Sequence, residues 1–321
     1  MKALMEVKNL KKHFPVKSGF SKKAMVKAVD GLEFTVYEGE TLSIVGESGC
    51  GKSTMGRCLL RLIEPTEGQI LFEGQDLMQL SPEEMRLRRR DMQLVFQDPF
   101  SSLNPRKTIR QILMEPLIVH NIGNTAEKKA KVEWIIEKVG LSPDYLNRYP
   151  HEFSGGQRQR VGIARALILQ PKLIVADEPV SALDVSIQAQ ILNLMHDLQK
   201  EFKLTYIFIS HDLSVVKHIS DRVAVMYLGK IVEIAHKSKL YQSPQHPYTK
   251  ALLSSVPLPN PDVKKERILL EGDLPSPSNP PTGCSFHPRC QNAVEACKNR
   301  APILEEKADH HLVSCHLIEK R

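Results

Sequence analysis

A run of small residues between an apolar segment and a helix-like segment has the composition of a phosphate-binding loop. Gly46-Glu-Ser-Gly-Cys-Gly-Lys-Ser-Thr54 fits the pattern G-x-x-x-x-G-K-S/T. Its glycines let the backbone wrap around phosphate oxygens, and the start of the following helix attracts negative charge. Lys52 is placed to reach the β- and γ-phosphates, and the Ser53 hydroxyl to coordinate Mg²⁺. We predict nucleotide contacts from the whole loop: Gly46, Glu47, Ser48, Gly49, Cys50, Gly51, Lys52, Ser53 and Thr54.

Two carboxylates end another apolar segment. Leu173-Ile-Val-Ala-Asp-Glu-Pro179 predicts a buried strand whose tip carries Asp177 and Glu178. Asp177 is placed to hold Mg²⁺, and Glu178 to polarise an attacking water as general base. An acidic pair alone is typical of a solvated strand end, so the catalytic interpretation depends on the phosphate loop.

Single polar residues follow two further apolar segments. Gln97 comes after Met92–Phe96, and His211 comes after Tyr206–Ser210. Because the carboxyl ends of parallel strands meet at one edge of a sheet, both side chains are candidates for the same site, although a lone Gln or His is usually structural. The amide suits a metal or a water, and the imidazole suits a γ-phosphate oxygen. The predicted catalytic set is Glu178, His211, Gln97 and Lys52, with Mg²⁺ held by Ser53, Gln97 and Asp177.

A second anion-binding device is predicted in Phe153-Ser-Gly-Gly-Gln-Arg-Gln-Arg160, which precedes an amphipathic helical pattern. Ser154 is a plausible N-cap, and the glycines leave backbone N–H groups exposed at a helix N-terminus. The chain has two such devices but one lysine-containing loop. This suggests that the second device binds a nucleotide held by a partner subunit.

Four of the six cysteines crowd the end of the chain, at Cys284, Cys290, Cys297 and Cys315. The close C-x₂₋₄-C pair typical of structural zinc is missing, and four spaced cysteines can instead ligate a 4Fe–4S cluster. Zinc stays open because four histidines could compete as ligands, and a segment of reduced cysteines without metal is the third alternative. The histidines are His287, His310, His311 and His316. Cys50 and Cys58 are interpreted as packing residues.

The elements that must position these residues alternate between short β-branched runs and longer helical patterns, which is typical of a mostly parallel sheet covered by helices. Strands are expected at Thr41–Val45, Met92–Phe96, Leu173–Asp177, Tyr206–Ser210 and Arg222–Tyr227. Val26–Val36 and Ile70–Phe72 favour a smaller antiparallel subdomain. Helices are expected at Lys52–Arg61, Glu127–Val139, Gln157–Leu169 and Ser186–Glu201.

The predicted fold class is α/β, a RecA-like P-loop NTPase domain over residues 1–235 with a helical insertion at about 100–153. The periodicity weakens after Ala235, where prolines accumulate between Pro257 and Pro281. Proline at that density argues for an extended connector. Residues 236–321 are therefore predicted to form a C-terminal Pro/Cys-rich extension.

Charge and hydropathy argue against two other classes of protein. The net charge is +7, but 44 basic residues are interspersed with 37 acidic ones, so we favour a solvated surface over a nucleic-acid site. No stretch approaches the roughly 20 apolar residues that cross a bilayer. Any transport function would therefore need separate membrane subunits.

The order of these motifs, together with Ser181-Ala-Leu-Asp184, resembles the ATP-binding-cassette family over about residues 4 to 235. The resemblance implies two nucleotide-binding subunits that close head to tail around two ATP molecules. Residues Ser154, Gly155, Gly156 and Gln157 would then face the nucleotide of the other subunit. Asp184 would link the two sites, and Phe14 resembles the aromatic residue that stacks on adenine.

Two further segments, Gln97-Asp-Pro-Phe-Ser-Ser-Leu-Asn-Pro-Arg106 and Ser243-Pro-Gln-His-Pro-Tyr-Thr-Lys-Ala-Leu-Leu253, look like oligopeptide/dipeptide importer ATPases, including nickel-uptake relatives. That resemblance implies ATP-driven peptide uptake at the cytoplasmic face of the cell membrane. Its implied partners are a related but different cassette subunit, two membrane-spanning permeases and, indirectly, an extracytoplasmic binding protein. The alternatives are a soluble cassette ATPase acting on nucleic acid or ribosomes, and an Fe–S redox-regulated ATPase.

Overall fold

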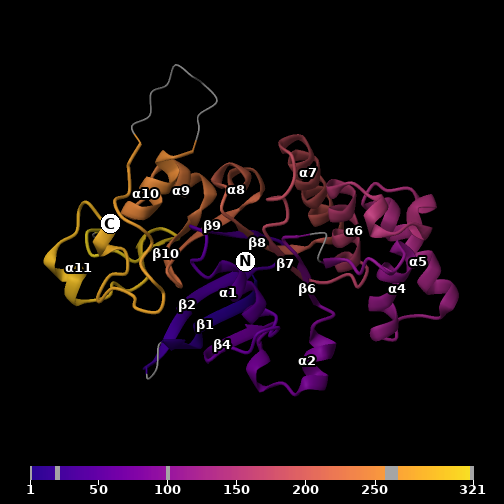
Figure 1. Cartoon of the computed structure of the whole chain (residues 1–321), viewed down its shortest axis with the longest axis horizontal. Coiled ribbons are helices and arrows are strands. Elements are labelled where there is room, and N and C mark those ends of the chain that lie inside the picture. Colours follow the sequence, from indigo (N-terminus) through magenta and orange to yellow (C-terminus); the bar gives the residue numbers. More distant parts are fainter. Residues whose placement is uncertain (1, 19–21, 99–101, 257–266, 319–321) are drawn as a thin grey trace. The chain divides into compact units, whose positions relative to one another are not determined.

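The computed structural model describes residues 2–18, 22–98, 102–256 and 267–318 (Figure 1). The chain divides into two compact units, Met1–Met78 with Ser210–Arg321 and Gln79–Ile209. No helix among the described residues is both long and apolar enough to cross a membrane.

An antiparallel sheet in the first unit comprises β1 (Ala3–Ser18), β2 (Lys22–Tyr37), β4 (Glu67–Phe72) and β5 (Gln75–Asp76), in the order β2-β1-β4-β5. Along β2, Leu32, Phe34 and Val36 are buried while the residues between them are more exposed. This alternation places one face of the sheet against the core. The predicted antiparallel subdomain is confirmed, with longer strands than expected.

Strands of the predicted central sheet begin in the first unit with β3 (Thr41–Val45), which pairs in parallel with β9 (Arg222–Tyr227). Strand β10 (Lys230–His236) pairs antiparallel with β9, and the extension adds β12 (His311–Val313) and β11 (Glu305–Ala308) beyond it. The helices of this unit are α1 (Lys52–Leu59), α8 (Leu213–Ile219), α9 (Lys237–Gln242), α10 (Pro247–Ser254) and α11 (Glu295–Asn299), with a 3₁₀ turn, η4, at His287–Arg289.

Parallel strands also form the centre of the second unit, where β7 (Leu173–Asp177) pairs with β6 (Met92–Val95) and β8 (Thr205–Ser210). All residues of β7 are buried, as expected for a parallel strand covered on both faces. Among the residues of this unit that the structure describes, the helices are α2 (Pro82–Arg88), α4 (Ile109–Val119), α5 (Thr125–Lys138), α6 (Gly155–Leu167) and α7 (Val185–Phe202). Short 3₁₀ turns lie at Leu77–Gln79, Pro143–Asn147 and Pro150–Glu152.

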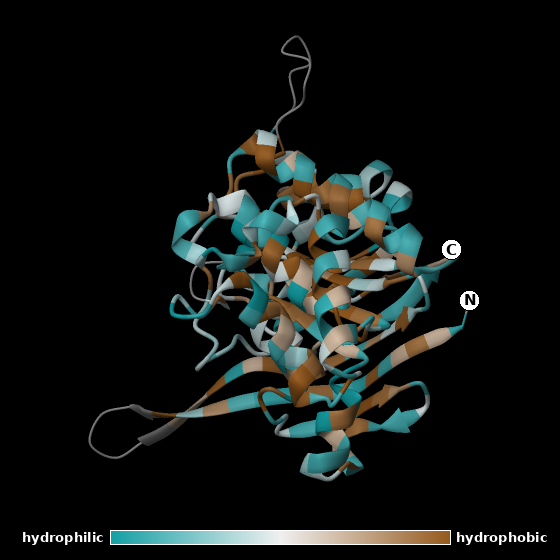
Figure 2. Ribbon diagram, turned by 90° about the vertical axis from the view of Figure 1, so that its right-hand side faces the viewer, coloured by the Kyte–Doolittle hydropathy of each residue, from teal (hydrophilic) through white to brown (hydrophobic). Residues whose placement is uncertain are grey.

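The helices carry hydrophilic and hydrophobic residues on the same ribbon (Figure 2), as expected for helices that cover a sheet with one face. No strand occurs among residues 102–153, all of which the structure describes, and α4 and α5 lie in this range. The predicted start of the insertion at residue 100 lies outside the described residues.

The expectation of an extended connector after Ala235 is wrong for residues 237–254, which form α9 and α10. The prolines that argue for a connector lie between Pro257 and Pro281, beyond these helices, and Pro247 occupies the first turn of α10, where a missing N–H costs nothing. The missed strand β10 and the short β11 and β12 depend on tertiary pairing rather than on a strong local pattern. Pro257, Pro259 and Pro261 lie outside the described residues.

Aromatic side chains pack the extension against the sheet of the first unit. Phe286 lies 5.3 Å from Tyr227 and 5.4 Å from Tyr248 between ring centroids, and the two tyrosines are 4.7 Å apart. All three are almost fully buried. Their tilted and edge-on geometry adds to the free energy gained from apolar burial.

A buried carboxylate forms a second connection to the extension. Glu233 on β10 has no exposed surface and accepts hydrogen bonds from the backbone N–H groups of Gln245 and His246, at 2.8 and 2.9 Å. His311 Nε2 on β12 lies 2.6 Å from the same carboxylate. Because an unpaired buried charge is costly, Glu233 favours the docked positions of both segments.

His246 is held in its neutral form. Its Nδ1 accepts the backbone N–H of Tyr248 at 3.1 Å, which caps α10. Burial lowers the pKa of His246 to about 4; the Glu233 carboxylate opposes this shift and Lys250 adds to it. Between about pH 6.5 and about pH 4, the unfolded chain therefore binds a proton at this histidine that the folded chain does not bind.

We expect stability to fall as the pH is lowered through this window, because protonation of His246 favours the unfolded state. The contribution of His246 between about pH 7 and about pH 5 is about 2 kcal/mol. His246→Asn keeps a capping side chain without a titrating group, so it should remove this part of the loss. The check is urea unfolding of the wild type and the variant at both pH values. His310→Asn, on an exposed histidine, is the control; an equal pH slope in His246→Asn and wild type contradicts the assignment.

Candidate nucleotide site

The phosphate loop connects β3 to α1 as the sequence predicts. Helix α1 begins at Lys52, directly after Gly51, whose φ of 103° lies in the left-handed region. The Lys52 side chain is buried, and its Nζ donates to the carbonyl oxygens of Gly46 and Glu47 at 2.8 and 3.0 Å. The ammonium group is thus fixed at the mouth of the loop, beside the backbone that would surround phosphates.

Close packing explains why two loop positions require glycine. A Cβ at Gly46 would lie 2.1 Å from the Met226 carbonyl oxygen, and a Cβ at Gly51 would lie 1.9 Å from the Ala28 carbonyl oxygen. Both obstacles are backbone atoms, which cannot turn aside as side chains do. The loop therefore rests directly on the backbone of β2 and of the end of β9.

The early cysteines behave as packing residues, in agreement with the sequence interpretation. Cys50 and Cys58 are almost fully buried. Burial raises the pKa of both thiols, that of Cys58 to about 11. A thiol that resists ionisation is a poor nucleophile.

Glu47 makes contacts that the sequence analysis missed. Its carboxylate lies 2.8 Å from Arg289 Nη1, and its backbone N–H donates to the Tyr248 hydroxyl at 3.0 Å. Both partners lie more than 200 positions away in the sequence, since the hydrogen bonds span 242 and 201 residues. No local pattern could have indicated these contacts, although Tyr248 lies within the segment that resembles importer ATPases.

Two other predicted site residues lie in the first unit. Phe14 is half-buried on β1 opposite Val26, and Lys12 Nζ lies 4.9 Å from the centre of its ring. His211 follows β8 and is exposed, and the next residue, Asp212, caps α8 by accepting the N–H groups of Ser214 and Val215.

The second unit brings Gln97, Asp177 and Glu178 to the ends of neighbouring parallel strands. Gln97 Nε2 donates to Glu178 Oε2 at 3.0 Å. Asp177 is buried, and Glu178 adopts a φ of 45°, an uncommon left-handed conformation for a side chain of this size. The strained turn directs the carboxylate beyond the strand, and the amide fixes its orientation.

Helix α6 begins with Ser154 as its N-cap, as the sequence predicts, and the structure adds a capping box with Gln157. Ser154 Oγ accepts the Gln157 N–H at 3.3 Å, and Gln157 Oε1 accepts the Ser154 N–H at 2.9 Å. A Cβ at Gly156 would lie 2.5 Å from the Ile187 side chain, and one at Gly155 would lie 3.2 Å from Leu183. The glycines thus serve packing against the start of α7 as well as exposure of the helix terminus.

Asp184 occupies the N-cap position of α7 and is exposed, but its side chain makes no capping hydrogen bond. The role of Asp184 across a subunit interface, which the family resemblance implies, stays a prediction.

The four C-terminal cysteines lie in one segment of the first unit. Cys284 N–H donates to the Cys297 carbonyl at 2.8 Å; Cys297 and Cys315 are buried, and Cys284 and Cys290 are half-buried. Among the described residues, the only potential ligands that lie in a group of three within 4.8 Å are the exposed Glu306, Asp309 and His310. A tetrahedral zinc site, with sulfurs about 3.8 Å apart, is not preformed at the cysteines.

Comparison with known families gives two matches in the chain. Residues 29–181 match the family described as ABC transporter, and residues 232–297 match the family described as oligopeptide/dipeptide transporter, C-terminal region. The chain is 60% identical over 319 residues to the oligopeptide transport ATP-binding protein AppF of Bacillus subtilis, covering 98% of this chain and 97% of AppF. The chain belongs to the ATP-binding-cassette family, in its oligopeptide/dipeptide transporter branch.

Other relatives of this cassette agree. It is 53% identical to the dipeptide transport ATP-binding protein DppF of Haemophilus influenzae, over 98% of this chain and 97% of DppF. Among solved structures, it is similar to the dimeric cassette MJ0796 bound to ADP and Pi, with a TM-score of 0.65 and 31% identity over 73% of this chain and 98% of that one. Similarity to CbiO1 of Clostridium perfringens, part of the transporter complex CbiONQ, has a TM-score of 0.66 and 26% identity over 76% of this chain and 92% of CbiO1. The predicted α/β P-loop fold is confirmed.

Two loop glycines provide a matched test of the packing in this cassette. Gly49 and Gly51 both have positive φ, but a Cβ at Gly49 would meet nothing within 4 Å. Gly49→Ala should cost only the backbone strain of about 1 kcal/mol. Gly51→Ala should cost more, because the loop must move off the Ala28 carbonyl, and it should also weaken ATP binding. Thermal unfolding and ATP titration of both variants provide the check; equal effects would remove the steric explanation.

Proposed function

We propose that this cassette hydrolyses ATP with Mg²⁺ to drive the uptake of peptides, as the nucleotide-binding subunit of an importer at the cytoplasmic face of the cell membrane. The observation that carries the proposal is the near full-length identity to AppF, which includes the C-terminal region of oligopeptide/dipeptide transporters. The boundary at residue 235 between cassette and extension stays a prediction.

The phosphate loop supplies binding and charge neutralisation. Its N–H groups and the Lys52 ammonium would hold the triphosphate, and Phe14 would stack on the adenine. The Ser53 hydroxyl, the Gln97 amide and the Asp177 carboxylate are oxygen donors that fit Mg²⁺. The metal would supply neutralisation of phosphate charge.

The Gln97–Glu178 hydrogen bond supports a role for Glu178 as general base. In the proposed step, a water oxygen attacks the γ-phosphorus, the bond to the β–γ bridging oxygen breaks, and the Glu178 carboxylate accepts the proton of the water. Gln97 would hold the carboxylate in place, and His211 would donate to a γ-phosphate oxygen. These contacts would orient the water for attack, and no covalent intermediate with the protein would form.

We further propose that the site is completed by a second cassette subunit. Ser154, Gly156 and the neighbouring groups at the start of α6 would bind the nucleotide on the partner, and Asp184 would lie at the interface. The dimer of the similar cassette MJ0796 supports this arrangement. The further partners proposed are a different but related cassette chain, two permeases and an extracytoplasmic peptide-binding protein; no nucleic acid is expected.

Glu178→Gln should retain ATP binding and lose steady-state hydrolysis by at least about a hundredfold, because an amide cannot accept the proton of the water. The purified variant should accumulate as a closed dimer with ATP, measured by gel filtration, and membranes containing the whole importer should lose uptake of labelled peptide. Glu152→Gln, an exposed acidic residue of the same unit, is the control. Undiminished turnover in Glu178→Gln would remove the residue from the base role.

We also propose that Cys284, Cys290, Cys297 and Cys315 ligate a 4Fe–4S cluster. The donor chemistry fits, because four thiols lie in one segment with two of them tied by a backbone hydrogen bond, and a cubane cluster is larger than a single zinc ion. A bound cluster would order the extension.

The full chain purified without oxygen should then be brown and contain stoichiometric iron and sulfide. Cys284→Ser and Cys290→Ser should each lose the colour, whereas Cys58→Ala, in the packed core behind the phosphate loop, should keep it. Colourless protein that contains zinc would reject the cluster.

A further inference from the structure

An acidic residue within the phosphate loop needs an electrostatic explanation. Glu47 is the second residue of the loop, and its side chain is only 27% exposed. A carboxylate at this place repels the phosphate groups that the loop is built to hold, and partial burial weakens screening by water and salt. An uncompensated Glu47 would therefore oppose nucleotide binding.

The compensating charge comes from the C-terminal extension. Arg289, in η4, lies 2.8 Å from the Glu47 carboxylate, and its side chain is 9% exposed. Its guanidinium carbon also lies 6.0 Å from the centre of the Tyr227 ring, within cation–π range. A pair so protected from solvent holds a more fixed geometry than an exposed ion pair.

A second contact fixes the backbone at the same loop residue. The hydroxyl of Tyr248 accepts the Glu47 N–H, and the ring of Tyr248 is locked between Tyr227 and Phe286. The side chain of Glu47 is thus held by Arg289 and its backbone by Tyr248, and both partners come after β10 in the chain. Rotation of the Glu47 side chain toward bound phosphates would break the ion pair with Arg289, and a shift of its backbone would break the hydrogen bond to Tyr248.

We propose that Arg289 is a positioning residue for nucleotide binding: it neutralises Glu47 and, with Tyr248, couples ATP affinity to the docked C-terminal extension. The proposal rests on the proposed nucleotide-binding role of the phosphate loop. It gives the extension an effect on the ATPase site that does not require contact with the permease or with cargo.

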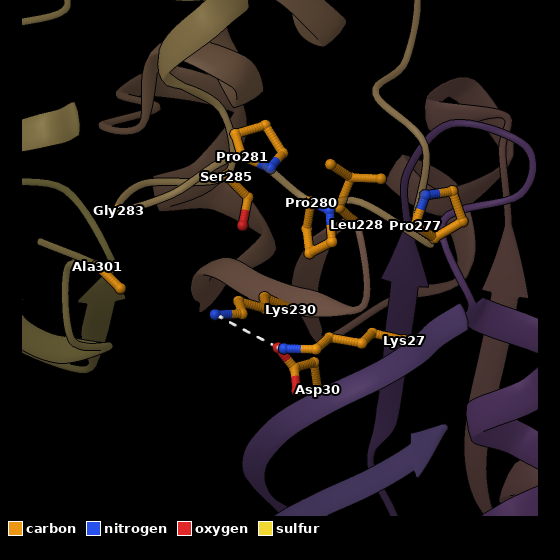
Figure 3. A pocket seen from close by; sticks show the side chains of 10 residues that line it. All are labelled: Lys27, Asp30, Leu228, Lys230, Pro277, Pro280, Pro281, Gly283, Ser285 and Ala301. Atoms are coloured by element: carbon orange, nitrogen blue, oxygen red, sulfur yellow. Dashed lines mark ion pairs between the residues drawn. The ribbon is translucent and has the colours of Figure 1, made fainter. Parts of the chain in front are cut away.

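The extension is anchored to the cassette independently of Arg289, so the residue can be changed without undocking it. Lys27 N–H donates to the Pro277 carbonyl at 3.0 Å, and β12 pairs with β10. A cavity of about 210 Å³ lies next to this contact. In Figure 3, Pro277, Pro280 and Pro281 line one side of the cavity, and Asp30, Lys27 and Lys230 line the other. Asp30 lies 3.6 Å from Lys230 Nζ and 3.9 Å from Lys27 Nζ.

The test is ATP titration of the full chain at low ionic strength. Arg289→Met should weaken ATP binding about tenfold, because Glu47 is left uncompensated, and added salt should shrink the deficit. Arg289→Lys keeps the charge and should stay close to wild type. Arg300→Met, which removes an exposed arginine from the same extension, is the matched control and should not change affinity.

A double variant separates charge compensation from a general structural role. Glu47→Gln combined with Arg289→Met should bind ATP within about twofold of Glu47→Gln alone, since no carboxylate then needs compensation. In hydrolysis assays, Arg289→Met should raise KM and leave kcat within about twofold.

The outcomes are distinguishable. Wild-type protein that does not bind ATP contradicts the proposed function. Wild-type binding with unchanged affinity in Arg289→Met overturns the inference alone. A double variant as weak as Arg289→Met also overturns it, because the loss would then be structural damage rather than uncompensated charge.

Discussion

The close approach of the phosphate loop to the backbone beneath it is the constraint on which the rest of the site depends. Gly46 and Gly51 lie so near the carbonyl oxygens of Met226 and Ala28 that neither position tolerates a Cβ. The Gly229 N–H adds a hydrogen bond of 2.9 Å to the Cys50 carbonyl. The loop is therefore a rigid layer on β2 and on the turn between β9 and β10, and its N–H groups keep fixed directions.

This seating links the ATPase site to the C-terminal part of the chain. Strand β9 leads into β10, where Glu233 holds the start of α10 and, through His311, the strand β12. The same region contributes Tyr248 and Arg289 to Glu47. The extension thus helps to hold the phosphate loop in place, because its buried Tyr248 and its Arg289 both contact Glu47 of the loop.

The second unit combines a different set of constraints. The strand tip at Asp177 and Glu178 requires a left-handed residue, and Gln97 stabilises the resulting carboxylate position. Helix α6 begins with a capping box in which Ser154 and Gln157 satisfy each other, so the direction of the helix start is fixed by local hydrogen bonds. The Glu178 carboxylate and the start of α6 are thus both held in place by local structure. Such fixed polar groups suit a site that acts on phosphates without rearrangement.

The sequence alone determined the local chemistry: the glycine loop, the acidic strand tip, the Ser154 cap and the positions of the parallel strands all follow from short-range patterns. Such patterns can be recognised in the sequence because glycine conformation and helix capping depend on residues only a few positions apart. Only the tertiary structure decided the helices at 237–254, the burial of Glu233, and the Arg289 and Tyr248 contacts to Glu47. The Glu47 contacts join segments more than 200 residues apart, and Glu233 meets His311 78 residues away. Such partners come together only through packing, which no local periodicity encodes.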